Sequence, residues 1–394
     1  EKETKRMRTI SIRKKCLAVF LCIFLTVSIA ACQKPSEEEE TLKDRDKEIS
    51  QELEFDHSME LSYAEQFAVD YYKDGYVLIT ISNGDRYLVI PEGKKTPQEL
   101  DEGIVLLYQP IDHIYLAASA VMDMFVSINA LDRIRFSSLK TESWYVEEAR
   151  TAMERGSILY AGKYSAPDYE QILDESCGLA IENTMIYHTP EVKEQLESSG
   201  IPVFVDYSSY EKKPLGRTEW VKLYGLLSGK EEEATAAFDR EKEAFEQISQ
   251  DKATGKTVAF FYITSNGEVN VRKASDYLPK MIEMAGGSYI LKQDEEDDSV
   301  SSTMSMDMES FYAAAKDADY IIYNSTVDGE ISTVDELTEK SGLLEHFKAV
   351  EEGNVYCTSK NLYQSTMKLG SIISDLYKIL HGEEDTLTYI YRLE

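Results

Sequence analysis

The sequence predicts an α/β fold in which two lobes with mostly parallel sheets are joined by a long spanning α-helix. Two observations predict this fold. Strand-like and helix-like segments alternate in both halves of the chain, which is typical of parallel sheets covered by helices. The order of segments also repeats, because three pairs of landmarks lie 139, 141 and 142 residues apart: Glu170 and Glu309, Asn183 and Asn324, and Gly200 and Gly342.

The stretch 214–252 between the two halves predicts linking helices. Pro214-Leu215-Gly216 interrupts the preceding structure, and apolar residues from Trp220 to Leu227 indicate a short amphipathic helix. Ser228-Gly229-Lys230-Glu231 has the form of a capping box and opens a second helix, whose narrow apolar stripe runs from Ala234 to Ile248. At about 1.5 Å per residue this helix is roughly 30 Å long, which suits a strut between two bodies. An ordinary surface helix of one large domain is the alternative.

Length and charge narrow the class of protein. The 394 residues are enough for two domains with full cores. The 72 Asp and Glu residues against 42 Lys and Arg give a net charge of −30, which argues against nucleic acid and against an anionic membrane surface as the main partner. Of the five Cys residues, only Cys177 and Cys357 follow residue 32, so no disulfide framework is indicated.

The first 32 residues predict a lipoprotein signal peptide. Basic residues between Lys5 and Lys15 precede an apolar run, Cys16 to Ile29, that is too short for a comfortable membrane span. The small residues Ala30-Ala31 then stand directly before Cys32. This junction resembles the lipobox of bacterial lipoproteins, in which the Cys is acylated. The resemblance implies a protein anchored in the cell membrane by Cys32, on its extracytoplasmic face; an uncleaved signal anchor is the alternative.

Between the leader and the first lobe we expect a disordered acidic tether, residues 33–58, because this stretch is charged and nearly free of aliphatic residues. The N-terminal lobe is expected over residues 59–213. It begins with a hairpin, Tyr76 to Ile90, with its turn at Asn83-Gly84-Asp85. A strand at Ile111–Ala117 follows, then a helix with Ser119 at its N-cap and a second helix over Glu142–Arg155.

The repeated unit completes this lobe and recurs in a C-terminal lobe, residues 253–394. In each copy a helix opens at an Asp (Asp168, Asp307), and the next strand ends at an Asn (Asn183, Asn324). A further helix and strand follow. Parallel sheets built in this way bind ligands in a crevice at the carboxyl ends of their strands.

Taken together, these features resemble the substrate-binding lipoproteins of ABC importers, in particular those for iron–siderophore complexes, haem and cobalamin. The resemblance covers roughly Ile111 to Leu380. It rests on the lipobox, the tether and the two lobes, and on four motifs: Pro-Leu-Gly-Arg-Thr-Glu-Trp before the spanning helix, Leu131-Asp132-Arg133-Ile134 at an expected strand-to-helix junction, Pro-Asp-Tyr-Glu at a helix start, and Met284-Ala285-Gly286-Gly287-Ser288 at a helix end.

The resemblance implies a ligand held between nearly rigid lobes and delivered to an ABC permease and its ATPase. One Glu on each lobe would meet Arg residues of the permease. By position these are Glu170 and Glu309, both in the first turn of the repeated helix. The alternative is that each carboxylate merely favours its helix dipole.

Candidate ligand contacts lie beside the expected strand ends or helix starts. Aromatic faces suit a large planar or chelated ligand, and an Arg could hold an anionic group. Each aromatic residue could instead belong to the core or the open surface, the Asn residues could serve turns, and the Arg could be solvated. The candidates are Ser119, Trp144, Tyr164, Asn183, Tyr207, Tyr210, Arg272, Asn324 and Tyr363.

Catalytic and metal motifs are missing from the sequence. The five His residues show no metal-ligand spacing, and neither Gly-x-Ser-x-Gly nor a phosphate-binding loop occurs. We therefore predict no catalytic residue, no metal site, no cofactor and no enzymatic activity. Two hypotheses remain: a surface receptor that hands a metal chelate or corrinoid to an importer, and a two-lobed lipoprotein that acts as an adhesin or surface enzyme without transport.

Overall fold

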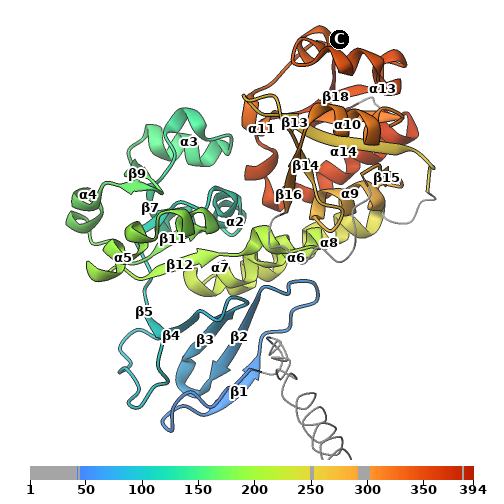
Figure 1. Cartoon of the computed structure of the whole chain (residues 1–394). Coiled ribbons are helices and arrows are strands. Elements are labelled where there is room, and N and C mark those ends of the chain that lie inside the picture. Colours follow the sequence, from blue (N-terminus) through green and yellow to red (C-terminus); the bar gives the residue numbers. More distant parts are fainter. Residues whose placement is uncertain (1–41, 43–44, 249–252, 292–301, 384–385) are drawn as a thin grey trace, which may run out of the picture. The chain divides into compact units, whose positions relative to one another are not determined.

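A computed structural model describes residues 42, 45–248, 253–291, 302–383 and 386–394 (Figure 1). The chain divides into two compact units, residues 1–45 and 46–394, and the architecture below is that of the second. Cys32 and the expected signal peptide lie outside the described residues. Within the described ranges, no helix has the length and apolar character needed to cross a membrane.

The first sheet of this unit is a β domain that precedes the N-terminal lobe. Its strands pair in the order β1 (Phe55–Ser58), β2 (Phe67–Tyr72), β3 (Val77–Ile81), β4 (Arg86–Ile90) and β5 (Ile104–Tyr108). The predicted hairpin is β3–β4. The expected tether is wrong over its last part, because β1 lies inside it and Ile49 is buried. Ile49 packs against an apolar face of this sheet, a burial that the charged composition of the segment did not indicate. The hydroxyl of Tyr72 also donates to Lys47 O at 2.7 Å, which holds the same segment against the sheet.

The N-terminal lobe is built on a parallel sheet with strand order β12-β11-β6-β7-β8. Its strands are β6 (Ile114–Leu116), β7 (Ile134–Ser137), β8 (Leu159–Tyr160), β11 (Ala180–Asn183) and β12 (Val203–Asp206), with a small pair β9 (Gly162–Lys163) and β10 (Ala166–Pro167). Helices α2 (Met122–Ser127), α3 (Glu147–Glu154), α4 (Tyr169–Asp174) and α5 (Pro190–Ser198), and short 3-10 helices η2 (Ser119–Val121), η3 (Leu131–Arg133), η4 (Thr141–Ser143), η5 (Thr184–His188) and η6 (Ser208–Tyr210), connect them.

Two helix predictions in this lobe need correction. Ser119 is the first residue of η2, and the N-cap position falls on Ala118, with no side-chain cap. The helix expected from Glu142 begins only at Glu147, because Trp144 is in the extended conformation. Leu131–Arg133 leads through η3 into strand β7, so the junction there enters a strand.

The linking helices are α6 (Pro214–Glu219), α7 (Val221–Ser228) and α8 (Glu231–Ile248). Gly229 ends α7 in the left-handed conformation, φ 69°, which glycine adopts without strain. The stripe of α8 packs inward as predicted, with Ala234, Ala237, Phe238 and Phe245 buried. By contrast, α7 is buried on nearly all sides, because α2, α6 and α8 pack around it.

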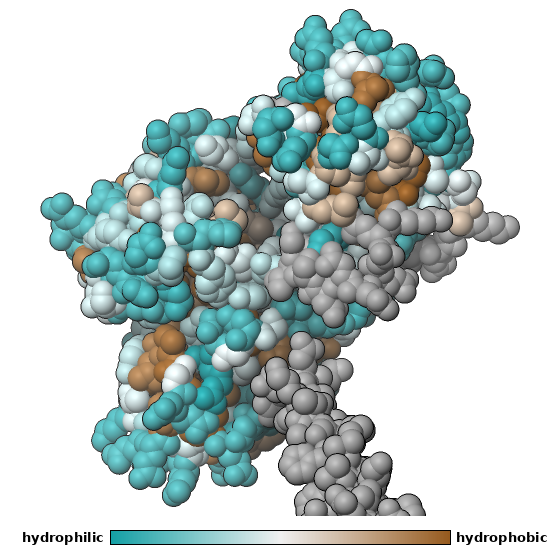
Figure 2. Space-filling model, viewed as in Figure 1, coloured by the Kyte–Doolittle hydropathy of each residue, from teal (hydrophilic) through white to brown (hydrophobic). Residues whose placement is uncertain are grey.

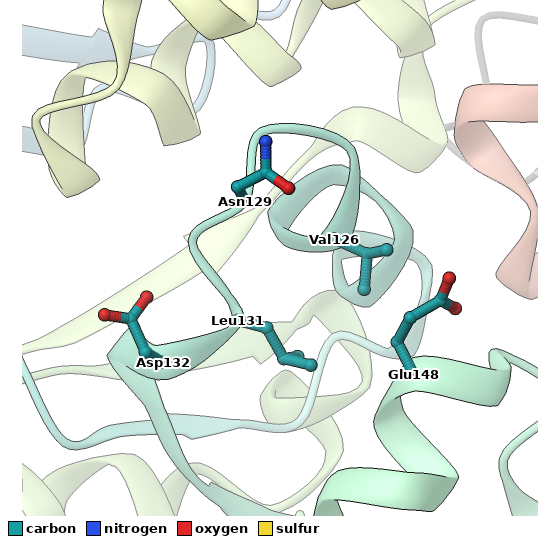
Figure 3. A pocket seen from close by; sticks show the side chains of 5 residues that line it. All are labelled: Val126, Asn129, Leu131, Asp132 and Glu148. Carbon is teal, nitrogen blue, oxygen red and sulfur yellow. The ribbon is translucent and has the colours of Figure 1, made fainter.

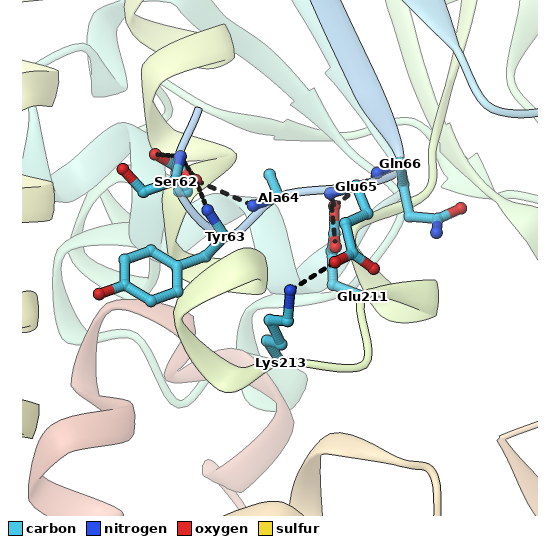
Figure 4. A network of polar contacts seen from close by, with 8 residues as sticks. Ser62, Tyr63, Ala64, Glu65, Gln66, Glu211 and Lys213 are labelled. Atoms are coloured by element: carbon cyan, nitrogen blue, oxygen red, sulfur yellow. Dashed lines mark hydrogen bonds and ion pairs between the residues drawn. The ribbon is translucent and has the colours of Figure 1, made fainter. Parts of the chain in front are cut away.

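Two buried carboxylates fasten the β1–β2 loop to these helices (Figure 4). Glu219 accepts the backbone N–H groups of Ser62, Tyr63 and Ala64 at 2.7–3.1 Å. Glu211 accepts those of Glu65 and Gln66 at 2.9 Å, and also the indole N–H of Trp220. Hydrogen bonds to a charged acceptor are the stronger kind. The β domain is therefore fixed to the linking helices.

The C-terminal lobe holds a larger mixed sheet in the order β16-β14-β13-β17-β18-β19, with β15 also pairing with β13. Its strands are β13 (Thr257–Ile263), β14 (Val269–Arg272), β15 (Ser288–Tyr289), β16 (Thr303–Met306), β17 (Tyr320–Tyr323), β18 (Val355–Thr358) and β19 (Ile390–Arg392). Its helices are α9 (Tyr277–Met284), α10 (Met308–Ala315), α11 (Ser325–Asp328), α12 (Val334–Thr338), α13 (Lys348–Glu351) and α14 (Leu369–His381), with η7 (Gly342–His346), η8 (Leu362–Gln364) and η9 (Thr366–Lys368).

The structure confirms the two-lobed α/β fold. The core of each lobe has parallel neighbours, β6-β11-β12 in one and β13-β17-β18 in the other. Both repeated helices start in the same way: Asp168 accepts from Gln171 N, and Asp307 from Ser310 N.

Candidate ligand-binding site between the lobes

The candidate site is the hollow between the lobes, which the space-filling view shows open to solvent (Figure 2). Segments that follow the strands of the N-terminal lobe reach the other lobe directly, since Tyr145 N donates to Gln364 Oε1 and Thr366 donates to Ala120 O. The carboxyl ends of those strands therefore face the C-terminal lobe, as a crevice between α/β lobes requires.

On the C-terminal side, the structure brings three predicted residues together. The hydroxyl of Tyr363 accepts from Arg272 and, at 2.9 Å, from Asn324 Nδ2. The guanidinium of Arg272 also lies 3.6 Å from Asp276 and donates to Ser302 at 3.3 Å. Its side chain is 13% exposed. Arg272 is thus a mostly buried cation whose charge is partly balanced by Asp276.

A second cation, Arg217 on α6, lies beside this group and was missed as a site residue. Its guanidinium stands 4.1 Å from the centre of the Tyr277 ring, and Nη1 donates to Ser209 O at 3.1 Å. Burial raises the pKa of Tyr277 to about 12, although both Arg217 and Arg272 lower it. Tyr277 therefore stays protonated although both guanidinium groups act on it. Arg217 could have been found, because it belongs to the Pro-Leu-Gly-Arg-Thr-Glu-Trp motif.

On the N-terminal side, two predicted tyrosines meet a third. The rings of Tyr207 and Tyr210 are 5.2 Å apart, and Tyr207 donates to the hydroxyl of Tyr187 at 3.1 Å. Asn83, in the turn of the β domain, donates to the same hydroxyl. This aromatic group follows β11 and β12, at the end of the sheet where the crevice is expected.

Other large apolar side chains are exposed at the ends of strands or after them. An apolar patch marks a binding site only where such residues are contiguous, so they are additional candidates for ligand contact. Sequence reasoning missed them because exposure is a property of the folded chain. They are Tyr145, Tyr160, Met185 and Tyr187 in the N-terminal lobe and Val327 in the C-terminal lobe.

Asn183 and Asn324 have structural tasks. Each caps the turn that follows its strand, Asn183 by accepting from Met185 N and Asn324 from Thr326 N. The amide of Asn183 also donates to Ala117 O. These bonds are of the Asx type that the sequence left as an alternative.

Trp144 requires a correction. Its side chain is 1% exposed and its indole N–H donates to Ser137 at 2.9 Å. We therefore assign Trp144 to the core of the N-terminal lobe, where it presents no face to a ligand. Tyr164, between β9 and β10, is half-buried against the other side of the sheet, and Ser119 is half-buried at the start of η2.

The two candidate docking residues occupy equivalent positions. Glu170 and Glu309 are the second residues of α4 and α10, and both are exposed.

A different hollow lies on the N-terminal lobe, lined by Val126, Asn129, Leu131, Asp132 and Glu148 (Figure 3). It has acidic groups but neither aromatic nor cationic ones, and so differs from the crevice.

Among the residues that the structure describes, no three His, Cys, Asp or Glu side chains are grouped so that they could hold a metal ion. The donors that meet in the crevice are guanidinium, amide and phenol groups. This set suits the surface of a larger molecule rather than a bare cation.

Comparison with known proteins identifies the family. The sequence model of the periplasmic binding proteins matches residues 119–362, which is more than half of the chain. The chain belongs to the periplasmic binding protein family. Members of this family bind substrates and are not enzymes. The match begins after the β domain.

A relative aligns along most of the chain, and solved structures share the fold. An uncharacterized lipoprotein of Methanocaldococcus jannaschii is 26% identical over 94% of each chain. The periplasmic haem-binding protein HutB of Vibrio cholerae has the same fold, with a TM-score of 0.54, 16% identity and coverage of 68% of this chain and 99% of its own. The catecholate-siderophore-binding protein VctP of Vibrio cholerae also shares the fold. Its TM-score is 0.53 and its identity 14%, and the match covers 68% of this chain and 94% of VctP.

Proposed function

We propose that this protein is an extracytoplasmic solute-binding lipoprotein that delivers an intact metal chelate, of the siderophore or haem type, or a corrinoid, to an ABC permease and its ATPase. The observation that carries the proposal is that two mostly buried guanidinium groups, Arg217 and Arg272, both act on Tyr277 in a chain of this family. HutB and VctP, which share the fold, bind haem and a catecholate siderophore.

The charge of the crevice favours an anionic chelate. A net charge of −30 repels anions at long range, so an anion is held only where local cations outweigh that field. The guanidinium of Arg272 lies 3.6 Å from Asp276. Among the described residues no carboxylate lies within ion-pair distance of Arg217, although the buried Asp206 interacts with it electrostatically. A guanidinium fork matches a carboxylate or a pair of catecholate oxygens. Arg217 is therefore the stronger candidate for the anionic edge of the ligand.

The docking and anchoring roles complete the proposal. Exposed Glu170 and Glu309 would pair with Arg residues of the permease.

Cys32 would carry the lipid. The relative of this chain in Methanocaldococcus jannaschii is named a lipoprotein. Palmitate labelling of cells should mark the protein, and Cys32→Ala should abolish the label because no other thiol stands at that junction. Label that persists in the variant would contradict lipid attachment at Cys32.

Titration calorimetry tests ligand binding. The purified protein is titrated with haem, a ferric catecholate siderophore, cobalamin, and free iron or zinc ions. Arg217→Gln and Arg272→Gln should weaken binding of the anionic chelate about 10- to 100-fold, the scale of hydrogen bonds to charged groups, and leave cobalamin unchanged. Arg150→Gln, on exposed α3, is the matched control. Binding of a bare ion alone would overturn the proposal.

A further inference from the structure

Four hydrogen bonds join the N-terminal lobe to residues Gln364–Met367 of the C-terminal lobe, a segment that we name the latch. Gln364 makes two of them, donating from Nε2 to Ser143 O at 2.9 Å and accepting from Tyr145 N at 2.8 Å. Thr366 donates to Ala120 O at 2.9 Å, and Met367 N donates to Asp123 at 2.8 Å.

The carboxamide of Gln364 binds the backbone of Ser143 and Tyr145 with both its donor and its acceptor. Both of its polar atoms bind one short backbone stretch, on either side of Trp144, so a change in the distance between the lobes would break both bonds together. Gln364 is 8% exposed and Trp144 is buried. Water therefore has poor access to these bonds while the lobes are in contact, and opening would exchange them for bonds to water at a net cost in free energy.

Each side of the latch adjoins the crevice. Tyr363, next to Gln364, bonds with Arg272 and Asn324. Tyr145, the residue that Gln364 holds, is 43% exposed. The latch therefore connects a ligand-facing residue of one lobe with a ligand-facing residue of the other.

We propose that Gln364 is a positioning residue that fixes the separation of Tyr145 and Tyr363 and thereby sets which ligand sizes the crevice accepts. This role rests on the proposed function for its ligand, but the latch itself belongs to the geometry of the free protein. The linking helices restrain the lobes at their base, and the latch restrains them beside the site.

The test uses two variants of the full chain. Gln364→Met keeps the side-chain length and removes both bonds. Gln364→Glu keeps the acceptor for Tyr145 N and removes the donor to Ser143. Gln195→Met is the matched control, because the side chain of Gln195 donates to Ser199 at the end of α5, in the N-terminal lobe itself. A single cooperative thermal unfolding transition in each variant shows that it is folded.

Two readouts need no ligand. Exchange of the Tyr145 amide hydrogen should become about tenfold faster in Gln364→Met and stay slow in Gln364→Glu. Spin labels at Glu194→Cys and Glu345→Cys, with Cys16, Cys22, Cys32 and Cys177 replaced by Ser and Cys357 left buried, should show a broader distance distribution in Gln364→Met. Unchanged exchange and an unchanged distribution would overturn the latch whether or not any chelate binds.

A third readout measures size selection with haem and with the larger cobalamin. In Gln364→Met, dissociation of whichever probe binds the native protein should be about tenfold faster, and the ratio of the two affinities should shift towards cobalamin. An unchanged ratio, together with a broadened distance distribution, would refute the role in size selection. Absence of binding to the native protein would count against the proposed function alone, because exchange and distance still test the latch.

Discussion

Glu182 is a buried carboxyl group whose two oxygens have no hydrogen-bond partner among the described residues. It lies on β11, one residue before Asn183, on the side of the sheet that packs against α4 and α5. The titratable groups that interact with it are Tyr115 on β6 and Tyr169 on α4, both phenols. Burial raises the pKa of Glu182 to about 8 from an ordinary value of 4.5. The carboxyl is therefore neutral over most of the physiological range.

This burial makes stability depend on pH. Because the folded pKa is raised, the favourable contribution of the neutral acid is complete below about pH 4.5 and is lost as pH rises towards 8. Glu182→Gln should match the native protein near pH 4.5 and exceed its unfolding free energy by about 2–5 kcal/mol at pH 8. Denaturant unfolding across this range measures the effect, with exposed Glu194→Gln as control. Parallel pH profiles for Glu182→Gln and the native protein would refute it.

The helices α4 and α10 form a matched pair of surface elements. Each opens with an Asp cap, carries an exposed Glu in its second position and precedes a parallel strand. A helix dipole explains one such Glu. It does not explain why both remain exposed at equivalent sites of the two lobes.

Charge reversal tests these helices. Glu170→Arg and Glu309→Arg should each reduce uptake, because repulsion replaces attraction at a desolvated contact, and the double variant should lose at least tenfold. Ligand affinity should stay the same, since both residues lie on the outer surface. Glu191→Arg, a first-turn Glu of α5, is the control. Normal uptake by the double variant at normal surface level would exclude these residues from docking.

The elements also show how far sequence reasoning reached. Periodicity and the repeat predicted the lobes, the linking helices and both Asp-capped helices, because these depend on local spacing and on capping. The site was predicted only in part. Arg272, Asn324 and Tyr363 do meet. Trp144 was misplaced, because its packing into the core of the lobe is a property of the folded chain, where its indole N–H also donates to Ser137 of β7. Arg217 was overlooked, because its neighbour Tyr277 lies sixty residues further along the chain.

The protein as a whole adds a β domain to the two lobes of its family. Residues 119–362 match the family model, whereas β1–β5 precede them. The match with HutB covers 99% of HutB but only 68% of this chain, so about a third of this chain has no counterpart there. The M. jannaschii relative aligns over 94% of this chain. Glu211 and Glu219 tie this domain to the linking helices, so it stiffens the part of the molecule that separates the lobes. Under the proposed function, a crevice held in this way would lower the entropic cost of binding a fitting ligand.

The central claim is that an intact chelate or corrinoid lies between the lobes. Native mass spectrometry of the protein, purified gently from its own membranes, tests it most directly. We expect an added mass equal to one metal complex or corrinoid, which dissociates as a unit and is lost in Arg217→Gln if it is anionic. An added mass of a single bare metal ion that persists in Arg217→Gln and Arg272→Gln would contradict the claim.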